Sequence, residues 1–460
     1  LNTTFKDLPM GMVHRLIPNF FNLGGYATGS LNIGGNLGKT NFNYVASIEN
    51  AFFDKIYLGL LRSKGNYDGS FLYVEYAESN ANLNRIVSRG DVPFDLNLSS
   101  DNFGQFFEHK NINYNASARL ASMPFLSPYI TQLDSIIGII NIDLSLSGPS
   151  SAIKRNGEIT LLNSSIYTML IKNPITSVNG KGILKNNKLN IDNFKGSSIN
   201  TRDVNFEKIK DNISVEGSID FSKFFEPNYD LIVSSIQNKH IYLDVIPIDI
   251  TGIIDSMDLK VFGKDTVKIT GLVEVDEGTL FHEFISEDIG ETLISSDGVV
   301  MSYSLNVPIK DEGKFQNSQV DAIMTGEISL AKTGNEYWNI GGEVYIDDGS
   351  ILSFKDNFTG LNGYVTFDND GINPDMDLIA STTIADEEIR LRIKGDLDNA
   401  DLILESSSGF SESDIIELLT FGSRFEDQAM SSNGFGVQAT SVLGSLLETQ
   451  LEKNLEEMSG

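Results

Sequence analysis

The chain has 460 residues, of which 63 are acidic and 34 basic, so its formal net charge is −29. Such a surface repels a phosphate backbone, and we therefore expect no nucleic acid partner. The absence of cysteine excludes disulfide bonds and thiolate catalysis. Hydrophobic residues make up 40 % of the chain, enough for a sizeable core, yet no run approaches the roughly 18 residues of a membrane-spanning helix.

The N-terminal segment has neither the charged start nor the apolar core of a signal peptide. We expect the chain to be a fragment of a longer protein.

From the N-terminus to about residue 410, apolar and polar residues alternate. The segments “SLNIGG” near Leu31, “NIDLSLSG” near Ile142 and “DLKVFG” near Leu259 show this period of two. Clusters of Gly, Asn, Asp and Ser separate such segments about every 8–12 residues, as in an all-β chain. This pattern predicts an all-β fold made of a long, mostly antiparallel sheet.

One motif recurs along the chain: “GEITLLNSSIY” from Gly157, “GLVEVDEGTLF” from Gly271 and “GEVYIDDGSILSF” from Gly342. We interpret it as a β-hairpin in which residues 347–349 form a three-residue loop with left-handed glycine. In the last copy one face then holds Val344, Ile346, Leu352 and Phe354, and the other holds Glu343, Tyr345, Ile351 and Ser353. The apolar face of the middle copy holds Val273, Val275 and Phe281, and that of the first copy holds Ile159, Leu161 and Tyr167.

The alternation is clearest between residues 363 and 406. In “EIRLRIKGDL” the apolar residues share one face, while Arg390, Arg392 and Lys394 share the other. The apolar positions of these strands are Val365, Phe367, Met376, Leu378, Ile389, Leu391, Ile393, Leu402 and Leu404.

A long sheet with one apolar face can cover that face in two ways. It can close and fill its interior with side chains, or curl into a trough that holds a ligand. The residues alone do not decide between a closed sheet and a trough. Aromatic stretches near Phe20, Phe103, Phe125 and Phe221 either cover part of an opening or form local core plugs.

The C-terminal segment has helical periodicity. Ser411 and Asp414 approximate a capping box, apolar residues follow at helical spacing, and Gly422 ends this first helix. A second helix has an acidic face and an apolar stripe that includes Val442, Leu446, Leu447, Leu451 and Leu455. Acidic faces disfavour anionic lipid, so we expect the stripe to dock on protein, either its own sheet or a partner.

The sequence contains no recognisable catalytic or metal-binding motif. His282 is followed by Glu but lacks the second His of a zincin site, and the acidic pairs lack the spacing of a calcium loop. Nucleotide-binding and hydrolase motifs are also missing. We therefore predict a protein that is not an enzyme and has no cofactor or metal.

The segments “GEVYIDDGSILSFKDNFTGLNGYVTFDNDGINPDMDLIA” and “IRLRIKGDLDNADLILESSSGFSESDIIELLTFG” resemble the C-terminal domain of the TamB family, of the AsmA-like group. The resemblance covers residues 320–458. It departs at residues 407–409, where the family usually has a proline. The family also continues past the last helix into further strands and has an N-terminal inner-membrane anchor, and we expect this chain to lack both.

The resemblance implies a curled sheet, or trough, with an apolar interior, in the periplasm of a diderm bacterium and bridging its two membranes. It implies phospholipid as the ligand, the residues of the apolar faces named above as the groove, and a TamA-like or BamA-like outer-membrane barrel as a partner of the C-terminal end.

We predict three regions: a repeated β-trough at 1–319, a TamB-type trough segment at 320–410 that continues it, and amphipathic helices at 411–460. The leading hypothesis is a conduit that carries phospholipid toward the outer membrane. The alternatives are an assembly factor for outer-membrane proteins, docking on a barrel, and a structural stalk or adhesin.

Overall fold

The computed structural model describes residues 1–12, 23–36, 38–54, 56–123, 133–199, 210–223, 226–237, 239–246, 250–281, 300–351, 357–369, 373–396 and 399–421. These residues form two compact units, and each is considered by itself. The described parts of 1–239 and 260–267 form the first unit, and those of 240–259, 268–281 and 300–421 form the second.

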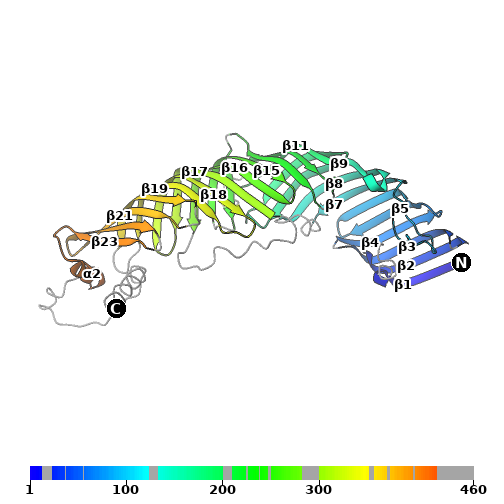
Figure 1. Ribbon diagram of the computed structural model, residues 1–460, viewed down its shortest axis with the longest axis horizontal. Coiled ribbons are helices and arrows are strands. Elements are labelled where there is room, and N and C mark those ends of the chain that lie inside the picture. Colours follow the sequence, from blue (N-terminus) through cyan, green and yellow to red (C-terminus); the bar gives the residue numbers. More distant parts are fainter. Residues whose placement is uncertain are drawn as a thin grey trace. The chain divides into compact units, whose positions relative to one another are not determined.

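The first unit is built of strands that follow one another in sequence order (Figure 1). Each strand from β1 to β12 pairs antiparallel with the next. The elements are β1 (Asn2–Pro9), β2 (Leu23–Asn36), β3 (Lys39–Phe53), β4 (Ile56–Tyr67), β5 (Leu72–Ala81), β6 (Asn84–Val92), β7 (Asn111–Ser122), β8 (Leu133–Pro149), the 3₁₀ turn η2 (Ser150–Ala152), β9 (Lys154–Thr168), β10 (Ile175–Lys185), β11 (Lys188–Ser197), β12 (Ile213–Asp220) and β13 (Asn228–Ser235).

The second unit repeats this arrangement and ends in a helix. Strand β14 pairs antiparallel with β15, and each strand from β17 to β22 pairs antiparallel with the next. The elements are β14 (Ile241–Val245), β15 (Ile250–Gly263), β16 (Thr266–Phe281), β17 (Val300–Gln316), β18 (Val320–Thr333), β19 (Asn339–Ile351), β20 (Phe358–Asp368), β21 (Asp375–Ile384), β22 (Glu387–Asp396), β23 (Asp401–Ser406) and α2 (Glu412–Phe421). Strands β15 and β16 contribute residues to both units. The fold class predicted from the sequence, a mostly antiparallel β-trough with a short C-terminal helix, is confirmed.

The recurring motif is not a hairpin, and that interpretation is wrong. Strand β19 runs without reversal through residues 347–349, and the other two copies lie inside β9 and β16. In the ladder with β18, Met324 pairs with Ile346 and Ile323 with Asp348, which leaves Asp347 as an extra, bulged residue. The acidic residues before Gly therefore mark a β-bulge in this copy.

The bulge corrects one predicted face. Strict alternation puts Ile351 on the other face of the strand from Val344 and Ile346. The extra residue shifts the alternation by one position and brings Ile351 to the same face. All three side chains are therefore buried in one cluster. The actual reversals include the turn at Ala385 and Asp386, where φ is 50° and 66°, as in a two-residue type I′ hairpin.

Glycines in the strand interiors allow the sheet to bend. Gly342 has φ 111°, and a Cβ there would lie 2.2 Å from the carbonyl oxygen of Glu327 on the neighbouring strand. Gly363 has φ 143°, and its Cβ would lie 2.1 Å from the oxygen of Asp377. Only glycine allows this conformation and this approach, and glycine kinks of this kind give a sheet its curvature.

Candidate functional site

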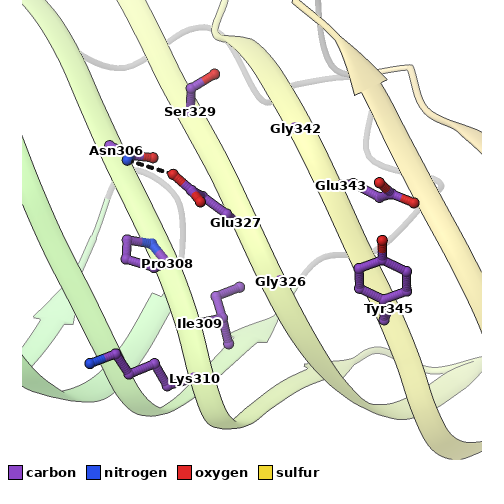
Figure 2. Close-up of a pocket in the computed structure, with 10 residues that line it drawn as sticks. All are labelled: Asn306, Pro308, Ile309, Lys310, Gly326, Glu327, Ser329, Gly342, Glu343 and Tyr345. Atoms are coloured by element: carbon purple, nitrogen blue, oxygen red, sulfur yellow. Dashed lines mark hydrogen bonds between the residues drawn. The ribbon is translucent and has the colours of Figure 1, made fainter.

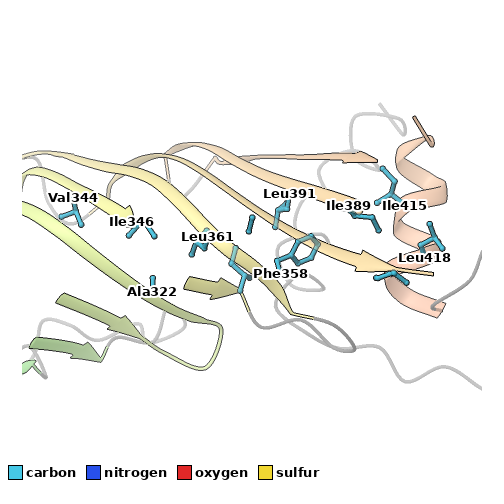
Figure 3. Close-up of a cluster of buried hydrophobic side chains, with 12 residues drawn as sticks. Ala322, Val344, Ile346, Phe358, Leu361, Ile389, Leu391, Ile415 and Leu418 are labelled. Atoms are coloured by element: carbon cyan, nitrogen blue, oxygen red, sulfur yellow. The ribbon is translucent and has the colours of Figure 1, made fainter. Parts of the chain in front are cut away.

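The second unit has one continuous apolar face, formed by strands β18 to β23 and helix α2 (Figure 3). Its buried members are Ala322, Val344, Ile346, Ile351, Phe358, Leu361, Ala380, Ile384, Ile389, Leu391, Ile415 and Leu418. We call this set and the half-buried residues packed on it the C-terminal apolar face.

Ten of the residues assigned to a groove from the sequence lie together on this face: Val344, Ile346, Val365, Phe367, Leu378, Ile389, Leu391, Ile393, Leu402 and Leu404. Met376 is buried on β21. Val273 and Val275 are half-buried in β16, whereas Phe281 is 41 % exposed. Leu352 and Phe354 lie outside the described residues. That these positions bind lipid stays a prediction.

The opposite face of the same strands is polar. Arg392, between the inward Leu391 and Ile393, donates from Nε and Nη2 to the two carboxylate oxygens of Asp377, at 2.7 and 2.6 Å. These hydrogen bonds lower the pKa of Asp377 and raise that of Arg392. Because successive side chains of a strand point to opposite faces, this bidentate pair lies on the polar face while Leu391 and Ile393 lie on the apolar face.

Burial differs between the two long margins of the C-terminal apolar face. At one margin the side chains are sealed: Phe358 and Ile389 are 0 % exposed and Leu391 is 1 % exposed. At the other margin several inward side chains stay partly exposed: Val365 and Phe367 on β20, Leu378 on β21, Ile393 on β22 and Leu402 on β23. Met376 on β21 and Val344, the partner of Val365 on β19, are buried at this margin. We call the first the sealed margin and the second the open margin. The face is thus fully covered along one side and only partly covered along the other.

Sequence reasoning missed several members of the sealed margin. Phe358 and Leu361 lie three residues apart yet share a face, because the ladder shifts register between Thr359 and Asn362 and Gly360 has φ 64°. The period-two rule cannot find such a pair. Ile415 and Leu418 were visible as a helical stripe, but nothing in the sequence indicated where the helix packs.

In the first unit, the segment that follows β6 packs against one face of the sheet, which we call the inner face of this unit. Phe94 and Leu96 are buried with Tyr67, and Phe103 packs against them. Asn97 holds the segment in place, since its Nδ2 donates to the Tyr67 hydroxyl and its Oδ1 accepts from the backbone N–H of Thr40. The stretch near Phe103 is therefore a local core plug. Parts of the other three aromatic stretches lie outside the described residues.

Elsewhere on this face two tyrosines add polar groups. The hydroxyl of Tyr44 lies 3.0 Å from Oγ of Ser63, and that of Tyr114 lies 2.8 Å from Oγ of Ser88. Burial raises the pKa of both phenols. They stay neutral at physiological pH, so the inner face carries no charge at these positions.

A second concavity lies on the polar side of β17 to β19 (Figure 2). It is an open groove of about 640 Å³ lined by Asn306, Pro308, Ile309, Lys310, Gly326, Glu327, Ser329, Gly342, Glu343 and Tyr345. Asn306 donates to Glu327 at 2.7 Å across it. Its lining mixes charged side chains, such as Lys310, Glu327 and Glu343, with Pro308, Ile309 and Tyr345, so it differs in chemistry from the uncharged apolar face.

Among the described residues, no three His, Cys, Asp or Glu side chains lie close enough to hold a metal ion. Within the same ranges, none of the helices has the length and apolarity to cross a membrane. His282 and the second C-terminal helix, with its stripe at Val442, Leu446, Leu447, Leu451 and Leu455, lie outside the described residues.

The fold and this face define an all-β protein whose curled antiparallel sheet has an apolar side with one open margin. The family model of the TamB C-terminal domain matches residues 83–460, and the chain therefore belongs to the TamB family. The resemblance seen in residues 320–458 is confirmed, and the match extends well beyond it toward the N-terminus. A comparison with curated proteins returned no match.

Proposed function

We propose that the chain is a non-enzymatic conduit for phospholipid, which carries it across the periplasm toward the outer membrane. The observation that carries the proposal is the open margin, where five inward apolar side chains stay partly exposed beside a sealed core. An acyl chain lying along this margin would cover these side chains, while the headgroup would remain in water.

The energy of such binding favours lipid over solvent. Burial of each CH₂ group stabilises by about 0.8 kcal/mol, so even a partly covered acyl chain gains several kcal/mol. A protein that used this margin only as core would cover it with its own side chains. The exposed apolar margin therefore favours a binding surface.

Membership in the TamB family supports a role in outer-membrane biogenesis. It also supports the periplasm as the location and an outer-membrane barrel protein as a partner. We propose that the apolar stripe of residues 442–455 contacts such a barrel.

The lipid proposal is tested by purification and by labelling. Native mass spectrometry should find phospholipid with the purified chain. In vesicles of phosphatidylethanolamine and phosphatidylglycerol that carry a diazirine on the acyl chain, adducts should map to Phe367 and not to the neighbouring Thr366, which points to the polar side. Equal labelling of the two residues, or no labelling of either, would contradict the proposal.

The barrel proposal has a separate test. Leu446→Glu with Leu451→Glu should weaken capture of the chain by a TamA-like barrel, because both changes place charge in the apolar stripe. Glu448→Gln, on the acidic face of the same predicted helix, is the matched control. Undiminished capture of the double variant would rule out the stripe as the contact.

A further inference from the structure

Helix α2 lies on the sealed margin of the C-terminal apolar face. Ile415 is 0 % and Leu418 is 3 % exposed, and both belong to the cluster that contains Ile389 and Leu391. In Figure 3 the two side chains point from the helix toward the strands, with Ile415 next to Ile389. Phe410, before the helix, and Leu419 pack on the same cluster.

The helix covers what would otherwise be a longer apolar strip. Along β22 the inward residues are Ile389, Leu391 and Ile393, in that order, of which the third is already partly exposed. Along β21 Ile384 and Ala380 are buried, and Leu378 is partly exposed. Removing α2 would uncover Ile389, at the start of β22, and lengthen the exposed strip along this strand (Figure 3).

The helix itself is a separable element. It has 10 residues, and isolated helices shorter than about 12–15 residues are marginal in water. Its first turn is capped locally: Ser411 Oγ donates to Asp414 at 2.6 Å, and the N–H of Asp414 lies 3.3 Å from Ser411 Oγ. Since both groups of the cap belong to this segment, displacement of α2 from the sheet breaks neither of these hydrogen bonds directly.

A short tether joins α2 to the sheet through one carboxylate. Glu387, at the start of β22, accepts hydrogen bonds from Ser407 Oγ at 2.9 Å and from the N–H and Oγ of Ser408, each at 2.7 Å. Glu387 is only 7 % exposed. These contacts fix the direction in which the chain leaves β23, and so place the helix over the cluster.

We propose that α2 is a displaceable plug of the lipid groove. Seated, its Ile415 and Leu418 occupy the sealed margin; displaced, it exposes Ile389 to the acyl chain and extends the path to the end of β22. The inference rests on the proposed lipid function and adds a means of regulating the same face. The tether at Glu387 holds the seated position.

The chain is well suited to a locking experiment because it has no cysteine of its own. Ile389→Cys with Ile415→Cys supplies two thiols at facing positions, to be joined by a disulfide or by a short bis-maleimide linker, and the joining is verified by mass spectrometry. An opened variant carries Ile415→Ser and Leu418→Ser. Circular dichroism confirms that each variant keeps its strand content.

Each variant, as the full chain, is incubated with the vesicles that carry the diazirine lipid, and adducts are mapped along β22. Locking should lower labelling of the start of β22, residues 387–391, several-fold relative to the unjoined double-cysteine variant and leave Ile393 unchanged. The opened variant should raise labelling of residues 387–391. Labelling of this segment that is the same in the locked and opened variants, with Ile393 labelled in both, would overturn the plug and leave the lipid function standing. Absence of label at Ile393 in every variant would overturn both.

Discussion

Leu391 and Leu404 offer a direct test of the difference between buried and partly exposed positions on the apolar face. They are cross-strand partners on β22 and β23, yet Leu391 is 1 % exposed while Leu404 is only half-buried. Truncation to alanine removes the same atoms from both positions. It leaves a closed cavity only at Leu391, since solvent or neighbouring side chains can fill the space at Leu404.

The magnitudes follow from the transfer and cavity terms. Leu391→Ala should cost about 3–4 kcal/mol, in the range of buried leucines that leave a cavity. Leu404→Ala should cost about 1.5–2 kcal/mol, close to the transfer term alone. The difference of about 1.5 kcal/mol corresponds to roughly a tenfold difference in the opening equilibrium.

Hydrogen exchange with mass spectrometry measures this opening locally, which suits a chain of two units whose global unfolding need not be two-state. Peptides that cover β21 to β23 should lose about tenfold more protection in Leu391→Ala than in Leu404→Ala. Equal losses in the two variants would refute the division of the face into buried and partly exposed positions.

Three further predictions concern the tether, the glycine kinks and the groove. Hydrogen bonds from the Oγ and then the N–H of Ser408 lower the pKa of Glu387, so the tether is stable at neutral pH and weakens as pH falls through this lowered pKa. The protection factors of residues 406–410, taken relative to the intrinsic exchange rate at each pH, should therefore fall in acid, and Glu387→Gln should flatten that dependence. Gly342→Ala should destabilise by about 1–3 kcal/mol in urea titrations through backbone strain, whereas Gly11→Ala, with open space around its Cβ, should change little. Leu402→Arg should abolish diazirine labelling of the open margin while the variant stays folded, and normal labelling would exclude this position from the lipid path.

Much of the fold is local in origin, which is why it could be predicted. The alternation in “EIRLRIKGDL” places Ile389, Leu391 and Ile393 on one face because the strand repeat is two residues, and the structure agrees. Antiparallel neighbours follow from short connections, such as the two-residue turn before Glu387.

The errors came from residues whose conformation depends on a neighbouring strand. An acidic pair before Gly is compatible with a turn and with a bulge, and the pairing with β18 decides for the bulge at Asp347. The same dependence hid Ile351 and Phe358 from the predicted apolar face. A one-residue shift reverses the faces, and no local pattern records it.

The sequence by itself determined the strand content, the apolar and polar faces of most strands and the membership in the TamB family, because these depend on side-chain order along the chain. The tertiary structure decided which part of the apolar face is covered. Burial of Leu391 and the seat of Ile415 depend on the cluster that strands β18 to β22 form together with α2, elements that the chain brings together only on folding. Whether an apolar face is core or binding surface depends on what lies over it, and that is a property of the packed molecule.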